Sequence, residues 1–199
     1  MRILAGQYKG RLLTMPRGIR PTQGKVRKAI LDTLGERIVG ARCLDLYAGS
    51  GAVGFEMLSW GAAHVTFVES HSAVLRVLEE NVRRLEGGSP SSLRSAGCGS
   101  GGQGRFLPVR IARGEAAEEI PRLEAAGEWF DVIFIDPPYS QGLIADCLQT
   151  LDHHVILAAD FHLIVQGFWK DRFPEDFRRF RQQKLVRYGD TAVAWYGPA

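Results

Sequence analysis

An aspartate, two prolines and a tyrosine form the stretch of this chain best equipped for chemistry, Asp136-Pro137-Pro138-Tyr139. They follow residues 130–135, FDVIFI, an apolar run typical of a strand buried on both faces. Prolines cannot extend a strand, so they hold Asp136 and Tyr139 at its carboxyl end. Ligands of open α/β sheets bind at that edge. A carboxylate, a carbonyl freed from the sheet and an aromatic ring would there hold a flat ring that bears an amine.

A glycine-rich turn, GSGAVG at residues 49–54, follows a second apolar run at residues 43–47. It satisfies the pattern GxGxxG between a strand and a helix, and Glu69 lies 20 residues past Gly49, as in dinucleotide-binding proteins. However, Asp45 precedes this turn, and its charge suits a cationic or amine-bearing ligand better than a pyrophosphate. The pattern therefore disfavours NAD, although a hydride-transferring dehydrogenase stays an alternative.

Acidic residues stand at the ends of three successive predicted strands: Asp45, Glu69 and Glu115. Glu69 suits the two hydroxyls of a ribose, and Glu115 could accept a hydrogen bond from the amine of an adenine. S-adenosylmethionine offers these acids a sulfonium, an ammonium, a ribose and an adenine. The residues therefore favour this cofactor.

The elements that must position these residues alternate along the chain. Strands are predicted near residues 43–47, 64–68, 106–112, 130–135 and 158–166, and helices near 24–36, 54–60, 72–85, 115–124 and 141–150. Two antiparallel edge strands, 185–188 and 191–196, are predicted around Gly189-Asp190. This order predicts an α/β fold with a Rossmann-like doubly wound sheet, mostly parallel with an antiparallel C-terminal edge.

Length and composition narrow the class of protein. With 199 residues, of which 45% are hydrophobic, we expect one main domain of an ordinary globular protein. No apolar run approaches the roughly 18–20 residues of a membrane helix, and the N-terminus lacks the apolar core of a signal peptide, so a cytoplasmic location is expected. Three widely spaced cysteines and the scattered histidines show no zinc pattern, and no metal is predicted.

Basic residues are concentrated at the start of the chain. Residues 1–42 hold ten basic and two acidic side chains, whereas the remainder holds 15 basic and 20 acidic ones. We therefore predict a basic N-terminal extension at 1–40, a short hairpin and a helix, that contacts RNA. A solvated surface is the alternative. The main domain is predicted at 41–199, with a flexible insertion rich in glycine and serine at 86–104.

Three stretches, DLYAGSGAVGFE, VTFVES and FIDPPY, resemble class I methyltransferases that modify exocyclic amines. The chain is most similar to the bacterial family that methylates N2 of the guanine numbered 966 in 16S ribosomal RNA. The opening MRILAGQYKGRLL and the segment RPTQGKVRKAIL carry the narrower similarity, which covers nearly the whole chain outside 86–104. Gln23-Gly24, Glu115 and Gln166-Gly167 depart from the residues usual in that family.

The resemblance implies a role for each candidate residue. Catalysis would fall on Asp136, Pro137, Pro138 and Tyr139. S-adenosylmethionine would be bound by Asp45, Ala48, Gly49, Ser50, Gly51, Glu69, Ser70, Glu115 and Ala116, and released as S-adenosylhomocysteine. RNA would be bound by Arg11, Arg20, Thr22, Lys25, Arg27 and Lys28.

The partner expected from the resemblance is 16S rRNA within a small ribosomal subunit or an assembly intermediate, and a monomer is expected. Two alternatives stay open. One is an amine methyltransferase for another acceptor: adenine N6 or cytosine N4 of DNA, or a glutamine of a protein. The other is a nucleotide-binding ribosome assembly factor without turnover, although such a factor would not need the amine-binding motif at residues 136–139.

Overall fold

The computed structural model describes residues 1–16, 18, 23–87, 107–139 and 142–199. The predicted insertion at 86–104 therefore lies almost wholly outside the described residues. Arg20 and Thr22, two of the predicted RNA contacts, also lie outside them.

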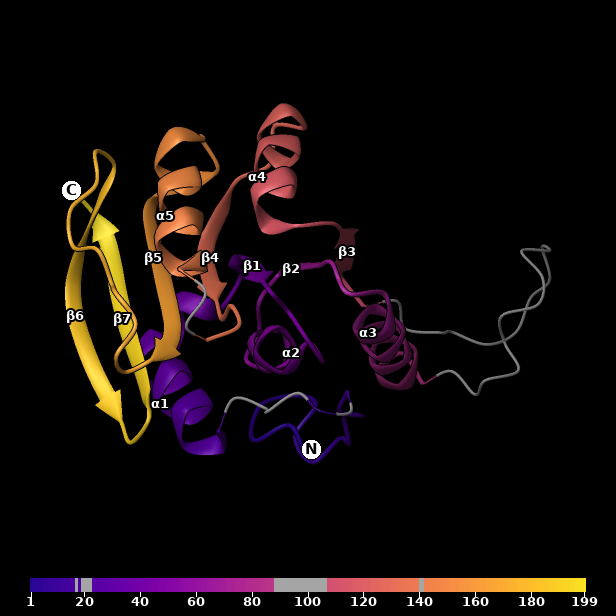
Figure 1. Ribbon diagram of the computed structural model, residues 1–199. Coiled ribbons are helices and arrows are strands. Elements are labelled where there is room, and N and C mark those ends of the chain that lie inside the picture. Colours follow the sequence, from indigo (N-terminus) through magenta and orange to yellow (C-terminus); the bar gives the residue numbers. More distant parts are fainter. Residues whose placement is uncertain (17, 19–22, 88–106, 140–141) are drawn as a thin grey trace.

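One sheet of seven strands, in the order β3-β2-β1-β4-β5-β7-β6, organises the described chain (Figure 1). The strands are β1 (Arg42–Leu46), β2 (His64–Glu69), β3 (Val109–Arg113), β4 (Phe130–Ile135), β5 (Leu157–Phe168), β6 (Phe180–Tyr188) and β7 (Thr191–Pro198). The first five are parallel, whereas β7 runs antiparallel to both β5 and β6. The predicted doubly wound sheet with its antiparallel edge is confirmed.

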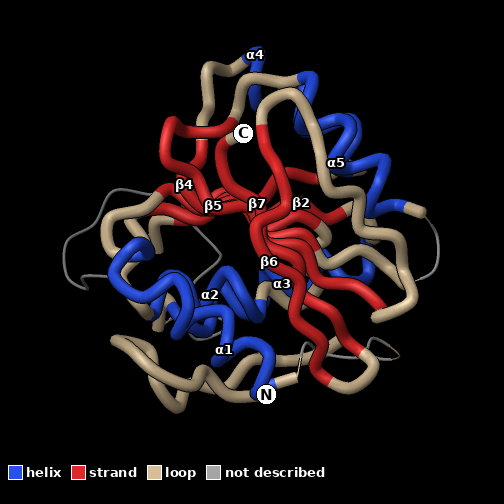
Figure 2. Tube along the Cα trace, turned by 90° about the vertical axis from the view of Figure 1, so that its left-hand side faces the viewer, coloured by secondary structure: helices blue, strands red, loops and turns tan. Residues whose placement is uncertain are grey.

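Helices cover both faces of this sheet (Figure 2). They are α1 (Gly24–Leu34), followed by the short 3-10 turn η1 (Gly35–Ile38), α2 (Ala52–Ser59), α3 (Ser72–Leu85), α4 (Ala116–Ala125) and α5 (Leu143–His153). Apolar residues of α1, α2 and α3 form one core cluster with the sheet, and those of α4 and α5 form the other. Strands buried on both faces explain the continuous apolar runs in the sequence.

The strand order reverses between β1 and β4, and this reversal positions the site. Leu46 pairs with Ile135 of β4 on one side and with Val68 of β2 on the other. The glycine turn after β1, Glu69 at the end of β2 and Asp136 after β4 therefore share one edge of the sheet. In doubly wound folds, ligands bind at such a reversal, outside the carboxyl ends of the strands.

Residues 1–14, called the N-terminal segment below, pack closely against the rest of the fold. The predicted hairpin at residues 1–14 is reduced to one isolated bridge, Arg2 to Leu12. Ile3 and Leu13 are 2% and 3% exposed and belong to the same core cluster as α2. Described residues before residue 40 therefore share one core with the sheet. The predicted boundary at residue 40, between an RNA-contacting extension and the main domain, stays a prediction. No helix in the described part of the chain is long and apolar enough to cross a membrane.

Candidate active site

Asp136 stands directly after β4, as predicted, with its side chain half-buried. Its backbone N–H donates to the carbonyl of Leu46 in β1 (3.4 Å). This hydrogen bond holds the end of β4 next to β1, where the strand order of the sheet reverses. One carboxylate oxygen, Oδ2, accepts a hydrogen bond from Nε2 of Gln166 in β5 (2.8 Å). The carboxylate is thus oriented by the neighbouring strand. Pro137 is buried and Pro138 is exposed, which ends the strand abruptly.

The turn between β1 and α2 needs its glycines. Tyr47 has φ 60°, an uncommon backbone conformation for a residue with a side chain, and it starts the reversal of the chain. Gly51 has φ 77°, and a Cβ there would lie 2.5 Å from Cδ1 of Leu78. At Gly54 a Cβ would lie 2.2 Å from Cε1 of Phe67, so this glycine lets α2 pack closely on β2. Ala48 and Ser50 are buried within the turn.

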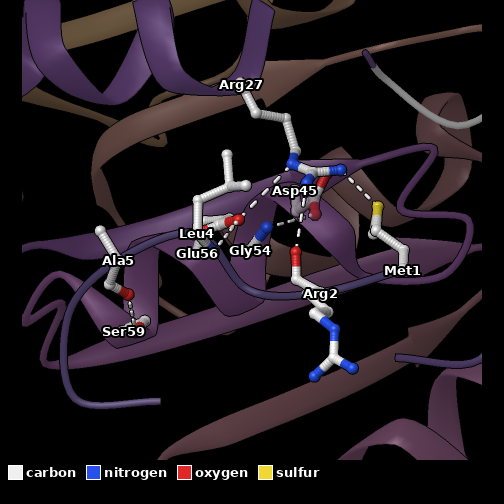
Figure 3. Close-up of polar contacts among 9 residues, drawn as sticks. All are labelled: Met1, Arg2, Leu4, Ala5, Arg27, Asp45, Gly54, Glu56 and Ser59. Atoms are coloured by element: carbon white, nitrogen blue, oxygen red, sulfur yellow. Dashed lines mark hydrogen bonds and ion pairs between the residues drawn. The ribbon is translucent and has the colours of Figure 1, made fainter. Parts of the chain in front are cut away.

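Asp45 lies beneath this turn and is 2% exposed. Its Oδ2 accepts the N–H of Gly54 (2.9 Å), so the carboxylate orders the start of α2 (Figure 3). Burial raises the pKa of the Asp45 carboxyl well above its ordinary value, the Gly54 hydrogen bond opposes this, and the charges of Asp136 and Glu69 raise it further. A cationic ligand above the turn would relieve the repulsion among these acids.

A pH-dependent stability follows from the raised pKa of Asp45. The folded protein binds this proton more tightly than the unfolded chain, so the contribution favours folding below the ordinary value of 3.8 and is lost as pH rises through the raised value. As pH rises above 3.8, we expect the free energy of unfolding of Asp45→Asn to fall less than that of the unaltered chain. Urea unfolding at several pH values measures this. Identical pH slopes would contradict the prediction.

Glu69, at the end of β2, is held by two backbone donors. Its Oε2 accepts the N–H of Gly49 (3.0 Å), and its Oε1 accepts the N–H of His71 (2.8 Å). Each carboxylate oxygen has a second lone pair that can accept another hydrogen bond. The carboxylate is therefore oriented at the rim of the glycine turn, where two ribose hydroxyls could donate to it. Ser70, next to it, is exposed.

Glu115 precedes α4, one strand further along the same edge. It is exposed and makes no side-chain hydrogen bond to the first turn of that helix, whereas Ala116 is buried. Asp45, Glu69 and Glu115 follow neighbouring strands in the order β1, β2 and β3. The acids therefore lie in the predicted order along this edge, and a role for each of them in binding the cofactor stays a prediction.

Tyr139 follows the two prolines and is half-buried. Its hydroxyl lies 3.5 Å from Oγ1 of Thr191, at the start of β7, and its ring centre lies 6.1 Å from that of Phe168. These contacts place the phenol beside the ends of β5 and β7. Asp136 and Tyr139 thus flank the same short segment, as a holder for a flat amine-bearing ring requires.

Arg27 corrects one prediction, since it is not an exposed RNA contact. It is 3% exposed, and its Nε lies 3.5 Å from Oε1 of Glu56 in α2 (Figure 3). Its guanidinium also donates to the carbonyl of Arg2 (3.3 Å) and contacts Sδ of Met1. Burial lowers the pKa of Arg27, and Glu56 raises it. Arg27 anchors the N-terminal segment and is buried away from any phosphate.

Three other predicted RNA contacts are exposed in the structure: Arg11, Lys25 and Lys28. Lys28 pairs with Asp32 one turn along α1 (2.6 Å), an exposed pair that a stronger anion can displace. Whether these residues bind RNA stays a prediction.

Asn81 of α3 is a site residue that the sequence did not reveal. It is 0% exposed; its Oδ1 accepts the N–H of Thr14 (2.7 Å), and its Nδ2 donates to the carbonyls of Thr14 (3.0 Å) and Ser50 (2.9 Å). One amide therefore joins the N-terminal segment to the glycine turn. In the sequence, Asn81 is one polar residue within an amphipathic helix, and nothing in its spacing marks the contact. Gln166, which orients Asp136, differs in the sequence from the residue usual in the family, and its contact with Asp136 is visible only in the structure.

The strand order of the sheet, with its antiparallel β7, is typical of class I methyltransferases. The glycine turn after β1 and the acids at the ends of the strands agree with this class. Solved structures agree: a putative methyltransferase of Escherichia coli superposes with a TM-score of 0.78 at 28% identity, covering 100% of this chain and 97% of that one. A second putative methyltransferase, solved in complex with S-adenosylhomocysteine, shares the fold alone, with a TM-score of 0.59 at 14% identity over 96% of this chain and 52% of that chain.

Comparisons of sequence place the chain more narrowly. It belongs to the family described as conserved hypothetical protein 95, which matches residues 1–197. It is 31% identical to ribosomal RNA small subunit methyltransferase D of Escherichia coli over 176 residues, 87% of this chain and 78% of that protein. It is 28% identical to the putative rRNA methyltransferase YlbH of Bacillus subtilis over 98% of both chains.

Proposed function

We propose that this chain transfers a methyl group from S-adenosylmethionine to the exocyclic N2 amine of a guanine in 16S rRNA, releasing S-adenosylhomocysteine. The observation that carries the proposal is the side-by-side placement of the Asp136–Tyr139 segment and the glycine turn at the strand reversal. The names of the relatives support an acceptor in the RNA of the small subunit. No metal is part of the proposal.

The residues around the glycine turn suit the proposed cofactor. Because Gly49 has no side chain, the backbone of the turn could approach a ligand closely. Glu69 would accept hydrogen bonds from the ribose hydroxyls, and Glu115 would accept one from the adenine amine. A sulfonium or ammonium group bound above the turn would favour the charged form of Asp45, and that carboxylate would in turn attract the cation. S-adenosylmethionine supplies an electrophilic methyl group on its sulfonium, so the protein's task is mainly to position the acceptor.

Asp136 and its neighbours would position the guanine. The lone pair of N2 is delocalised into the ring, which makes this amine a poor nucleophile. By accepting hydrogen bonds from its two N–H groups, the Asp136 carboxylate and the Pro137 carbonyl would favour the pyramidal amine and aim its lone pair at the methyl group. Tyr139 would stack on the base, which must leave its own stack to reach this pocket. The proton leaves after transfer, to Asp136 or to water.

Exposed basic residues of the N-terminal segment and of α1 would hold the RNA backbone. We expect the triple variant Arg11→Gln, Lys25→Gln and Lys28→Gln to bind 16S rRNA fragments more weakly and with a flatter salt dependence. Each lost phosphate contact reduces the slope of log affinity against log salt by about 0.7–0.9. Filter binding at several salt concentrations measures the slope. The control is Arg122→Gln on α4, over the other face of the sheet; a triple variant with the control's slope would contradict the assignment.

The deciding experiment is transfer of labelled methyl groups from S-adenosylmethionine to small-subunit particles of a strain that lacks its own enzyme, followed by nucleoside analysis. Label in N2-methylguanosine is the expected result. Label found only on DNA or protein would replace the acceptor while keeping the cofactor. If no acceptor is labelled, the proposed reaction is wrong, and the assembly factor without turnover becomes the better interpretation.

A further inference from the structure

A row of aromatic rings continues from Tyr139 across the carboxyl end of β5. The ring centres of Tyr139 and Phe168 are 6.1 Å apart, and those of Phe168 and Trp169 are 6.0 Å apart. Phe168 is half-buried, whereas Trp169 is 37% exposed. The row therefore leads from the ring proposed to stack on the target base to a large exposed ring on the surface beside it.

Cationic side chains lie against this exposed ring. The Cζ of Arg187 in β6 is 3.7 Å from a ring centre of Trp169, and Nζ of Lys170 is 5.1 Å from it. Arg187 and Lys170 are both exposed. The neighbouring acid Asp171 is half-buried, and its Oδ2 accepts the N–H of Phe168 (2.8 Å). The guanidinium of Arg187 thus lies over the indole of Trp169, and together they form the Trp169–Arg187 pair.

Two hydrogen bonds to backbone carbonyls hold this pair in place. The N–H of Trp169 donates to the carbonyl of Asp190 (3.0 Å), and Nε of Arg187 donates to the carbonyl of Gly189 (2.7 Å). Both acceptors belong to the turn between β6 and β7. The pair is therefore ordered without a ligand, so its side chains would lose little conformational entropy when a base stacks on them.

We infer that the Trp169–Arg187 pair binds a single-stranded nucleotide of the RNA next to the target guanine, with its base stacked on the pair and its phosphate near Lys170. The inference rests on the proposed function, because it places the target base on Tyr139. An extruded base leaves its neighbours partly unstacked, and indole rings and guanidinium planes are surfaces on which RNA bases stack. The row of rings gives such a neighbour a place within reach of the site.

The competing interpretation is that the pair only attaches the β6–β7 turn to β5. Trp129 offers a matched control, because it is 48% exposed and has Cζ of Arg42 5.1 Å from its ring centre. It directly precedes β4, at the opposite edge of the sheet from Tyr139. An exposed tryptophan with an arginine is therefore present at both edges, and only one of them adjoins the site.

The test compares Trp169→Ala and Trp129→Ala in the full chain. With a short single-stranded RNA of mixed sequence, we expect Trp169→Ala to raise Kd on the order of ten-fold, and Trp129→Ala to leave it unchanged. In methyl transfer to small-subunit particles, Trp169→Ala should raise KM by a similar factor with little change in kcat. Equal Kd values for the two variants would overturn the inference.

A second readout does not depend on the stability of the alanine variants. Stacking on a nucleobase quenches indole fluorescence, so RNA should quench the unaltered chain and Trp129→Phe, and Trp169→Phe should lose that part of the quenching. A signal unchanged in Trp169→Phe would show that the ring meets no base, and a protein partner or a purely structural role would then replace RNA.

The two proposals can fail separately. If the unaltered chain labels guanine but Trp169 variants match their Trp129 controls in Kd, KM and quenching, the nucleotide site falls and the proposed function stands. If the unaltered chain labels no acceptor while RNA still quenches Trp169, the reaction falls, and the site remains as a nucleotide-binding surface.

Discussion

Replacing Asp136 by asparagine is expected to slow methyl transfer by on the order of a hundred-fold or more, with little effect on the affinity for S-adenosylmethionine. The substitution preserves size but replaces one carboxylate oxygen by an amide NH₂. Because Gln166 already donates to Oδ2 of Asp136, the amide would keep its single oxygen toward Gln166 and turn its NH₂ toward the substrate amine. Two donors would then face each other where an acceptor is required.

The measurement is single-turnover transfer to small-subunit particles, with cofactor affinity measured separately by calorimetry. Asp160→Asn serves as the control, because Asp160 is exposed and lies in the first half of β5, away from the carboxyl edge. If Asp136→Asn turned over as fast as this control, Asp136 would not be the group that holds the amine. If both transfer and cofactor affinity collapsed, the residue would support the glycine turn instead.

Replacing Glu56 by glutamine is expected to cost about 3–5 kcal/mol of the free energy of unfolding, the largest effect on stability that we predict. Glu56 is 1% exposed, and both of its carboxylate oxygens accept the N–H of Leu4 (2.9 and 3.1 Å). Burial raises the pKa of Glu56, while the Leu4 hydrogen bond and the charge of Arg27 lower it. Glutamine keeps an acceptor for Leu4 but leaves the buried guanidinium without its counter-charge.

A double-mutant cycle isolates the ion pair. Adding Arg27→Met to Glu56→Gln should restore much of the lost stability, because a buried pair removed together costs far less than one partner removed alone. Asp32→Asn is the control on α1: it removes the exposed Lys28 pair, 66% and 48% exposed, and should cost less than about 1 kcal/mol. Urea unfolding measures five chains: the unaltered chain, Glu56→Gln, Arg27→Met, the double variant and the control. If Glu56→Gln were as stable as the control, the charge of Glu56 would not be needed to stabilise the buried guanidinium of Arg27, and the prediction would be wrong.

The buried ion pair matters for function because it anchors the N-terminal segment. Three backbone N–H groups donate to side chains of the main fold: that of Leu4 to Glu56, that of Tyr8 to Oγ of Ser59 (2.9 Å) and that of Thr14 to Asn81. The exposed Arg11 lies between the last two anchors. A loosened segment would therefore weaken the proposed RNA contact through positioning alone, without the change in salt slope expected when a basic side chain is removed.

Much of the fold could be predicted from the sequence, because its signals are local. The apolar run at 130–135 matches β4 in both bounds, and the amphipathic pattern at 72–85 matches α3. The Gly189-Asp190 turn does join two antiparallel strands, although β6 begins at Phe180, well before the predicted 185. The run of polar and basic residues at 181–184, RQQK, lies on an edge strand and does not show the apolar signal from which strand ends are predicted.

The candidate site divides in the same way. The glycine turn, the acids at the strand ends and the Asp136–Tyr139 segment could be located from the sequence, because residue type and the end of a strand both depend on nearby residues. It could not tell the buried Arg27 from the exposed Lys28, its neighbour on the same helix. Nor could it join Asn81 to Thr14 and Ser50, or Trp169 to Arg187, because those contacts are made across the chain. The burial of a side chain and its contacts depend on which surfaces meet when the chain folds, so they became known from the three-dimensional structure.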